Sequence, residues 1–178
     1  SEDETLKAAC EYAPGIRLLR QDKWESLISF IISQNNNIPR IKGIINRLCE
    51  QYGGFPLPEQ LNGVTADDLA FLRAGFRGKY LADCCMRVNS GILDLEKTAA
   101  LPLDEARKQL MTVKGVGPKV ADCVLLFGMH RTEAFPIDVW IKRVMERYYP
   151  NGLPECTKGN EGIAQQYLFH YMRTKADI

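Results

Sequence analysis

Several features that identify common classes of protein are missing from this sequence. No stretch approaches the roughly 20 apolar residues that a membrane-spanning helix requires, and no secretory signal is recognisable. The six cysteines include no C-x-x-C spacing and the histidines do not cluster, which argues against a zinc or iron–sulfur site. Scattered cysteines of this kind favour reduced thiols, so we expect an intracellular protein with no membrane partner. The net charge is only +1, so any surface that binds nucleic acid must be local.

Strand-like alternation of apolar and polar residues is also almost absent, whereas helical spacing is common. The clearest helix covers residues 24–34, where Asp22 is a suitable N-cap and Glu25 completes a capping box. Its core face is made by Leu27, Ile28, Ile31 and Ile32. Further helices are expected over 1–12, 39–51, 65–73, 80–90, 103–112, 120–129, 139–149 and 161–175, with turns over 53–57 and 98–103. The pattern predicts an all-α protein.

Two of the expected helices are joined by residues 113–119, Val-Lys-Gly-Val-Gly-Pro-Lys, a turn typical of a helix-hairpin-helix. Glycines allow a positive φ and a close backbone approach, and Pro118 suits the first position of the following helix. The free N–H groups at that helix start, with the positive end of the helix dipole, favour a phosphate. On its own this pattern favours a non-catalytic DNA-binding hairpin in which Lys119 is a phosphate ligand.

Three other features each allow a structural and a functional interpretation. Asp138 stands where the helix 139–149 begins, and an aspartate there is most often an N-cap, although a cap can also be catalytic. The asparagines 35–37 suit a turn between helices, or an amide cluster that faces a base edge. Phe76 lies beside Arg77 and between glycines, so it is either a core anchor or a loop tip that wedges into DNA.

Taken together, these motifs resemble the HhH-GPD superfamily of DNA glycosylases. Gly115-x-Gly117-x-Lys119 is followed by Pro136-x-Asp138, so that the aspartate stands nineteen residues after the lysine. Within the superfamily the chain is most similar to the 8-oxoguanine DNA glycosylase/AP lyases. The resemblance extends over nearly the whole chain, in residues 15–22, 33–41, 77–80, 117–123, 136–139 and 164–169. The cysteine cluster of the endonuclease III branch is absent.

The resemblance implies a catalytic pair, Lys119 and Asp138. Lys119 as a neutral amine would capture C1′ of the sugar and form a Schiff base, which leads to β-elimination of the 3′ phosphate. Asp138 would stabilise the positive sugar and orient or deprotonate the lysine. Lys114, in the hairpin tip, is a competing candidate whose position suits phosphate contact better. The implied partner is double-stranded DNA with an oxidised purine.

Further roles follow from the same resemblance, position by position. The lesion base would lie in a pocket made by Cys123, Gln165 and Phe169. The cytosine left opposite it would be read by Asn35, Arg40 and Arg77, with Phe76 as the wedge, although Tyr is more usual there. Phosphates would be held by the backbone N–H groups of Gly115, Gly117 and Lys119. No cofactor is implied, except for a structural cation on the carbonyls of Met111, Val113 and Val116.

The resemblance also predicts the architecture and points to two departures. The whole chain, 1–178, would form a glycosylase core of two helical lobes with the active-site cleft between them: 22–127 in one lobe, 1–21 and 128–178 in the other. Trp140 replaces a histidine that faces DNA in animal members, so that contact is in doubt and the ring would pack or stack. The family usually has an N-terminal β domain, so we expect this chain to be the core of a longer, monomeric protein. The alternatives left open are a non-catalytic hairpin module and a glycosylase for another damaged purine.

Overall fold

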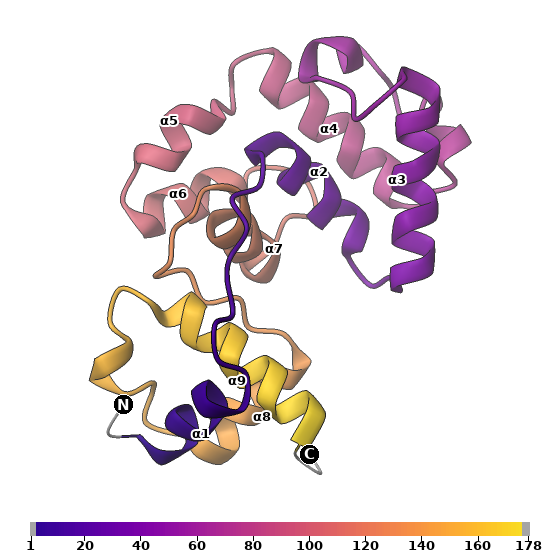
Figure 1. Ribbon diagram of the computed structural model, residues 1–178. Coiled ribbons are helices and arrows are strands. Elements are labelled where there is room, and N and C mark those ends of the chain that lie inside the picture. The colour runs from indigo at the N-terminus through magenta and orange to yellow at the C-terminus, as the bar shows by residue number, and fades with distance from the viewer. Residues whose placement is uncertain (1–2, 176–178) are drawn as a thin grey trace.

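The computed structural model describes residues 3–175, which form helices and no strand, as predicted (Figure 1). The larger lobe contains α2 (Lys23–Ser33), α3 (Ile38–Tyr52), α4 (Arg77–Asn89), α5 (Leu95–Ala100), α6 (Leu103–Leu110) and α7 (Pro118–Cys123), with the short helices η1 (Pro58–Leu61), η2 (Ala70–Leu72) and η3 (Val124–Gly128). The smaller lobe contains α1 (Glu4–Tyr12), α8 (Val139–Tyr148), η4 (Glu155–Thr157) and α9 (Glu161–Lys175). None of the helices within 3–175 is long and apolar enough to cross a bilayer.

Helix α2 is the centre of the larger lobe. Asp22 caps it by accepting a hydrogen bond of 3.0 Å from the N–H of Glu25, so the predicted cap is present. Its apolar face is almost fully buried and packs against α3, α4, α7 and η3. Burial of each such side chain stabilises the fold by about 1.5–3 kcal/mol. This lobe therefore has its own apolar core, which extends to Met129 and Ala134, past the expected boundary at 127.

The smaller lobe has a second core, made by helices from both ends of the chain. Helix α1 packs against α9, and α9 packs against α8. Leu6, Leu168 and Val144 meet in this core, and the Tyr149 hydroxyl donates a hydrogen bond of 2.7 Å to Asp3. Two segments, 13–22 and 129–138, cross between the lobes (Figure 1). The helices that carry the predicted site residues are thus divided between the lobes.

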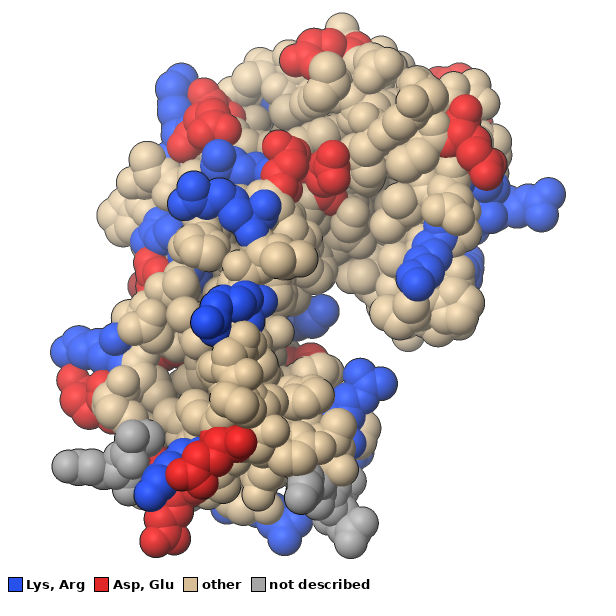
Figure 2. Space-filling view, viewed as in Figure 1, with Lys and Arg blue, Asp and Glu red and all other residues tan. Residues whose placement is uncertain are grey.

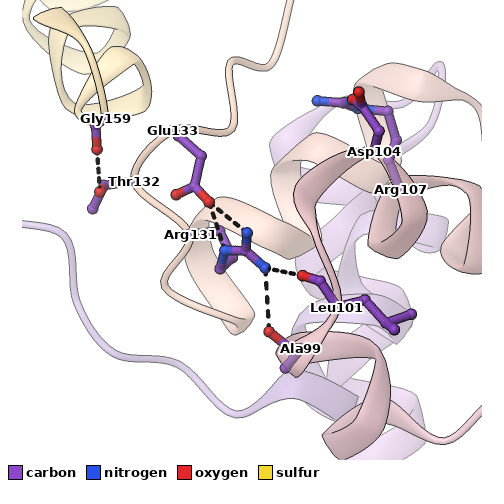
Figure 3. A network of polar contacts seen from close by, with 8 residues as sticks. All are labelled: Ala99, Leu101, Asp104, Arg107, Arg131, Thr132, Glu133 and Gly159. Carbon is purple, nitrogen blue, oxygen red and sulfur yellow. Dashed lines mark hydrogen bonds and ion pairs between the residues drawn. The ribbon is translucent and has the colours of Figure 1, made fainter.

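One of these crossing segments is fastened to both lobes by polar contacts (Figure 3). The Arg131 guanidinium donates hydrogen bonds to the carbonyls of Leu101 (2.7 Å) and Ala99 (3.3 Å) and pairs with Glu133. The Thr132 hydroxyl donates to the Gly159 carbonyl at 2.6 Å, on the side of the smaller lobe. These bonds restrict how far one lobe can turn relative to the other.

Three expected elements differ in the structure. The expected helix 65–73 is mostly turn, because Asp68 accepts hydrogen bonds from both the N–H and the hydroxyl of Thr65 and closes a local loop. The expected turn 98–103 is wrong for residues 98–100, which belong to α5; Asp94 caps this helix by accepting from the Lys97 N–H at 2.9 Å. The helix expected to run to Met129 is α-helical only to Cys123 and continues as the π-helical η3, an irregularity frequent near functional sites.

Candidate active site

The hairpin turn between α6 and α7 depends on Gly115. Its φ is +80°, and a Cβ built on it would lie 2.4 Å from ring atoms of Tyr80, so only glycine fits. Gly117 is different: its φ is −95°, and nothing lies within 4 Å of a Cβ there. Only Gly115 of the two hairpin glycines therefore uses the positive φ that glycine allows, and Gly117 serves as the N-cap of α7.

The start of α7 leaves backbone donors available. No backbone carbonyl of the described chain accepts from the N–H groups of Gly115, Gly117 or Lys119, as is usual at a helix start. The N–H of Lys114 is already engaged, because it donates to Asp83 on α4 at 2.7 Å. The Val113 carbonyl accepts from the Val116 N–H at 3.0 Å, which leaves one lone pair free. The phosphate and cation roles of this turn remain predictions.

Lys119 and Asp138 come from opposite lobes and line the same two cavities. Lys119 is exposed in the first turn of α7, with its Nζ 5.9 Å from the centre of the Phe30 ring. Asp138 is half-buried and caps α8: its Oδ1 accepts from the N–H of Ile141 at 2.8 Å. The predicted cap is confirmed, and it fixes the direction of the carboxylate. Lys114 lines neither cavity.

The first cavity is an open groove of about 560 Å³, which we call the active-site groove. It is lined by Ser33, Gln34, Asn35, Phe76, Tyr80, Lys119, Val120, Ile137, Asp138, Val139 and Lys142. Figure 2 shows the surface hollowed between the two lobes, with Lys and Arg side chains at its margins. Ile137 and Val139 are more than half exposed. The sequence prediction missed these two residues and Lys142, although all three lie within four positions of Asp138.

The second cavity, of about 220 Å³, is the aromatic pocket. It is lined by Phe30, Lys119, Cys123, Phe127, Pro136, Asp138, Gln165, Gln166 and Phe169, and so brings together the three residues predicted to hold the base. Gln165 is 5% exposed, and its side-chain N–H donates to the Pro136 carbonyl at 3.2 Å. The Gln165 Oε1 accepts a hydrogen bond from the side chain of Gln166. The sequence analysis did not single out Phe30 or Phe127, whose rings stack with centres 5.6 Å apart.

Cys123 forms part of the pocket wall as a neutral thiol. Burial raises its pKa to about 11, while the positive charge of Lys119 beside it acts in the opposite direction. The thiol is therefore protonated at neutral pH and gives the pocket an apolar, polarisable surface. That surface suits stacking against a flat ring, as predicted for this position.

The residues predicted to read the orphan base are only partly brought together. Asn35 is exposed and lines the active-site groove next to Phe76, whose side chain is 50% exposed. Arg40 is exposed at the edge of this region and donates to the Arg73 carbonyl at 3.4 Å. Arg77 is 1% exposed and does not line the groove. Its guanidinium donates to the backbone carbonyls of Gln34, Ala74 and Asn35, and its role at the orphan base stays a prediction.

Trp140 lies in the first turn of α8 and is half-buried. The Arg143 guanidinium carbon lies 5.6 Å from the centre of a ring of Trp140, a cation–π distance. Trp140 thus stacks on a neighbour of its own helix, which is one of the two outcomes expected for it, and it does not line the active-site groove.

Comparison with known proteins relates this geometry to characterised families. Residues 28–157 match the family described as "HhH-GPD superfamily base excision DNA repair protein". A "Probable N-glycosylase/DNA lyase" of Methanothermobacter thermautotrophicus is 32% identical, with 97% of this chain and 68% of that protein covered. An "N-glycosylase/DNA lyase" of Saccharomyces cerevisiae is 36% identical over 80% of this chain, but only 44% of its own length is covered.

A solved structure is similar over almost the whole chain. It is the 8-oxoguanine glycosylase/lyase of Clostridium acetobutylicum in complex with double-stranded DNA containing cytosine opposite 8-oxoguanine. The two share 40% sequence identity with a TM-score of 0.84, and the match covers 97% of this chain and 67% of that one. This chain belongs to the HhH-GPD superfamily of base excision DNA repair proteins.

Proposed function

We propose that this chain is the core of a glycosylase that excises 8-oxoguanine paired with cytosine from double-stranded DNA and then cleaves the strand as an AP lyase. The observation that carries the proposal is that Lys119 and Asp138, from opposite lobes, line both an open groove and an adjoining aromatic pocket. The groove can take a DNA strand and the pocket a flipped base, so the amine and the carboxylate lie where the sugar between them would be.

The pocket supports recognition of a flat, oxidised base. Phe169 and Cys123 supply two faces for stacking, and Gln165 supplies an amide for the Watson–Crick edge. Phe76, half-exposed at the groove, would fill the space that the flipped base leaves in the stack. Asn35, Arg40 and Arg77 would read the cytosine that remains.

The chemistry would then proceed at C1′. The bond between C1′ and the base breaks and its electron pair leaves with the base, while the Asp138 carboxylate stabilises the positive sugar. The Asp138 Oδ1 is held by the helix cap, and no bond within the described chain engages Oδ2. The Lys119 amine attacks C1′ and loses a proton. The C1′–O4′ bond of the sugar ring then breaks, O4′ takes up a proton, and the open-chain Schiff base forms between C1′ and the Lys119 nitrogen. Loss of a C2′ proton then expels the 3′ phosphate, which completes β-elimination.

The hairpin would position the strand for this reaction. The backbone N–H groups of Gly115, Gly117 and Lys119 would hold a phosphate at the start of α7. A structural cation on the carbonyls of Met111, Val113 and Val116 would neutralise a neighbouring phosphate. We further propose that the protein works as a monomer inside the cell.

Trapping with borohydride tests the proposal. Borohydride reduces a Schiff base to a stable amine, so wild-type protein should form a covalent adduct with a duplex that contains 8-oxoguanine opposite cytosine. Lys119→Gln should form none, whereas Lys114→Gln, the matched control in the same hairpin, should form as much as the wild type. If the wild-type protein forms no adduct, the chain is better explained as a non-catalytic DNA-binding hairpin. If a panel of lesion duplexes shows faster cleavage at another damaged purine than at 8-oxoguanine, that purine replaces 8-oxoguanine as the proposed substrate.

A further inference from the structure

Lys142 is a charged residue of the active-site groove that the reaction proposed above does not use. Three charged side chains line this groove, those of Lys119, Asp138 and Lys142. The first two are assigned to the sugar, which leaves Lys142 without a role. Its side chain is 71% exposed, so its ammonium group can reach a ligand in the groove without giving up contacts in a core.

Helix α8 sets the distance between Lys142 and the proposed reaction centre. Asp138 is the N-cap of α8, and Lys142 follows it by four residues. Residues at i and i+4 lie on the same face of a helix, with Cβ atoms about 5–6 Å apart. Both line the groove together with Val139, so this face of α8 is turned toward it. The spacing is comparable to that between a deoxyribose and the phosphates attached to it.

No strong partner holds Lys142 elsewhere. Among residues 3–175 its Nζ pairs only with Glu146, at 3.9 Å, and both side chains are mostly exposed. Surface pairs of this kind contribute little and are screened by salt. Arg143, the next residue, is instead stacked on Trp140, with its guanidinium carbon 5.6 Å from a ring centre. Lys142 is therefore available to a ligand in the groove.

The surroundings of Lys142 favour a phosphate as that ligand. The groove wall beside it is apolar, because Ile137 and Val139 are more than half exposed there. An apolar wall can pack against sugar rings but cannot compensate the charge of a DNA backbone. A lysine ammonium is a compact charge with three donors, which suits phosphate oxygens. Charge compensation on this side of the groove thus depends on Lys142.

We propose that Lys142 binds a backbone phosphate beside the damaged nucleotide and so holds the strand on the smaller lobe, while the hairpin holds another phosphate on the larger lobe. The proposal rests on the proposed function, because it takes the groove to be the path of the strand. A phosphate contact carries no information about the bases, so Lys142 should contribute equally whatever base faces the lesion.

The test neutralises the phosphates of the DNA one at a time. Each duplex contains an uncleavable tetrahydrofuran site and one methylphosphonate in place of a phosphate within two nucleotides of that site. At the phosphate that Lys142 contacts, this change should weaken binding of the wild type about fivefold. It should not weaken binding of Lys142→Gln, which has already lost the contact. If Lys142→Gln keeps the wild-type loss of affinity at every position, the proposal is overturned.

The salt dependence of binding gives a second readout. Loss of one phosphate contact should reduce the slope of log K against log salt concentration by about 0.9 in Lys142→Gln, and Lys142→Arg should restore it. The matched control is Lys7, which pairs with Glu11 four residues later at 4.0 Å in the same lobe but lines neither cavity. Lys7→Gln should bind as the wild type does.

An unchanged slope in Lys142→Gln, or the same change of slope in Lys7→Gln, would contradict a contact at the groove. Borohydride trapping of the wild type tests the proposed function separately. A missing adduct together with the expected methylphosphonate pattern would reject the lyase and leave the phosphate contact of Lys142 in place.

Discussion

Replacing Gly115 by alanine should disturb the hairpin by two separate physical effects. The backbone there has a φ of +80°, a conformation that costs an L-residue about 1–2 kcal/mol. The new Cβ would also lie 2.4 Å from Cδ2 and Cε2 of Tyr80 and 2.7 Å from Cζ, so the ring or the turn must move. Overpacking of this kind typically costs a further 1–3 kcal/mol or so. We expect Gly115→Ala to lower the free energy of unfolding by about 2–5 kcal/mol.

Urea denaturation followed by circular dichroism measures this change, and Gly117→Ala is its matched control. Gly117 lies two residues away with a φ of −95° and no atom within 4 Å of a Cβ. Alanine there should leave stability within about 0.5 kcal/mol or raise it slightly. The double variant Gly115→Ala/Tyr80→Ala should lose less free energy of unfolding than the two single variants lose together. Removing the Tyr80 ring removes the clash, and only the cost of the positive φ at residue 115 remains. Equal stability of the two glycine variants would refute the reasoning.

Three other predictions follow from single contacts. Asp138→Asn keeps a good N-cap, so it should leave the free energy of unfolding in urea nearly unchanged while it strongly reduces strand cleavage. Asp138→Ala should lose strand cleavage and also lower the free energy of unfolding by about 1 kcal/mol, because alanine cannot cap α8. Burial raises the pKa of Cys123 to about 11, so iodoacetamide at pH 8 should modify the exposed Cys156 before Cys123, as followed by mass spectrometry. The free energy of unfolding should also fall as the pH rises from 9, because the Cys123 thiol loses its proton in the unfolded chain before it does so in the folded one. Arg131→Met should lower the free energy of unfolding by about 1–3 kcal/mol in a denaturant titration, because the carbonyls of Ala99 and Leu101 lose their donor. Arg143 is exposed, so Arg143→Met is the control and should change that free energy little.

The elements that could be predicted from sequence are those whose signals are local. Asp22 and Asp138 stand directly before apolar, helically spaced residues, and both cap the helices predicted for them. Helix α5 was missed although Asp94 supplies the same kind of cap, because the helix is only six residues long. Short helices depend on tertiary packing more than on their own sequence, so a six-residue window gives little periodicity to detect.

The position of Arg77 could not be predicted for a different reason. Arginine next to an exposed aromatic in a glycine-bounded loop is typical of a DNA contact, and most arginines are exposed. Its actual partners are carbonyls of residues 34 and 35, more than forty positions earlier, and backbone carbonyls carry no signature in the sequence. Only the folded chain shows that the carbonyls of residues 34 and 35 find their donor in Arg77.

The division of the site between two lobes explains why a local motif was not sufficient to find it. Lys119 belongs to the larger lobe and Asp138 to the smaller one, and the segment that joins them contains Arg131, which is bonded to the carbonyls at the end of α5. If the lobes turned relative to one another, each of these two residues would keep its helix and its cap, but their spacing across the groove would change. The contacts of this segment therefore determine whether the amine and the carboxylate can act on the same sugar.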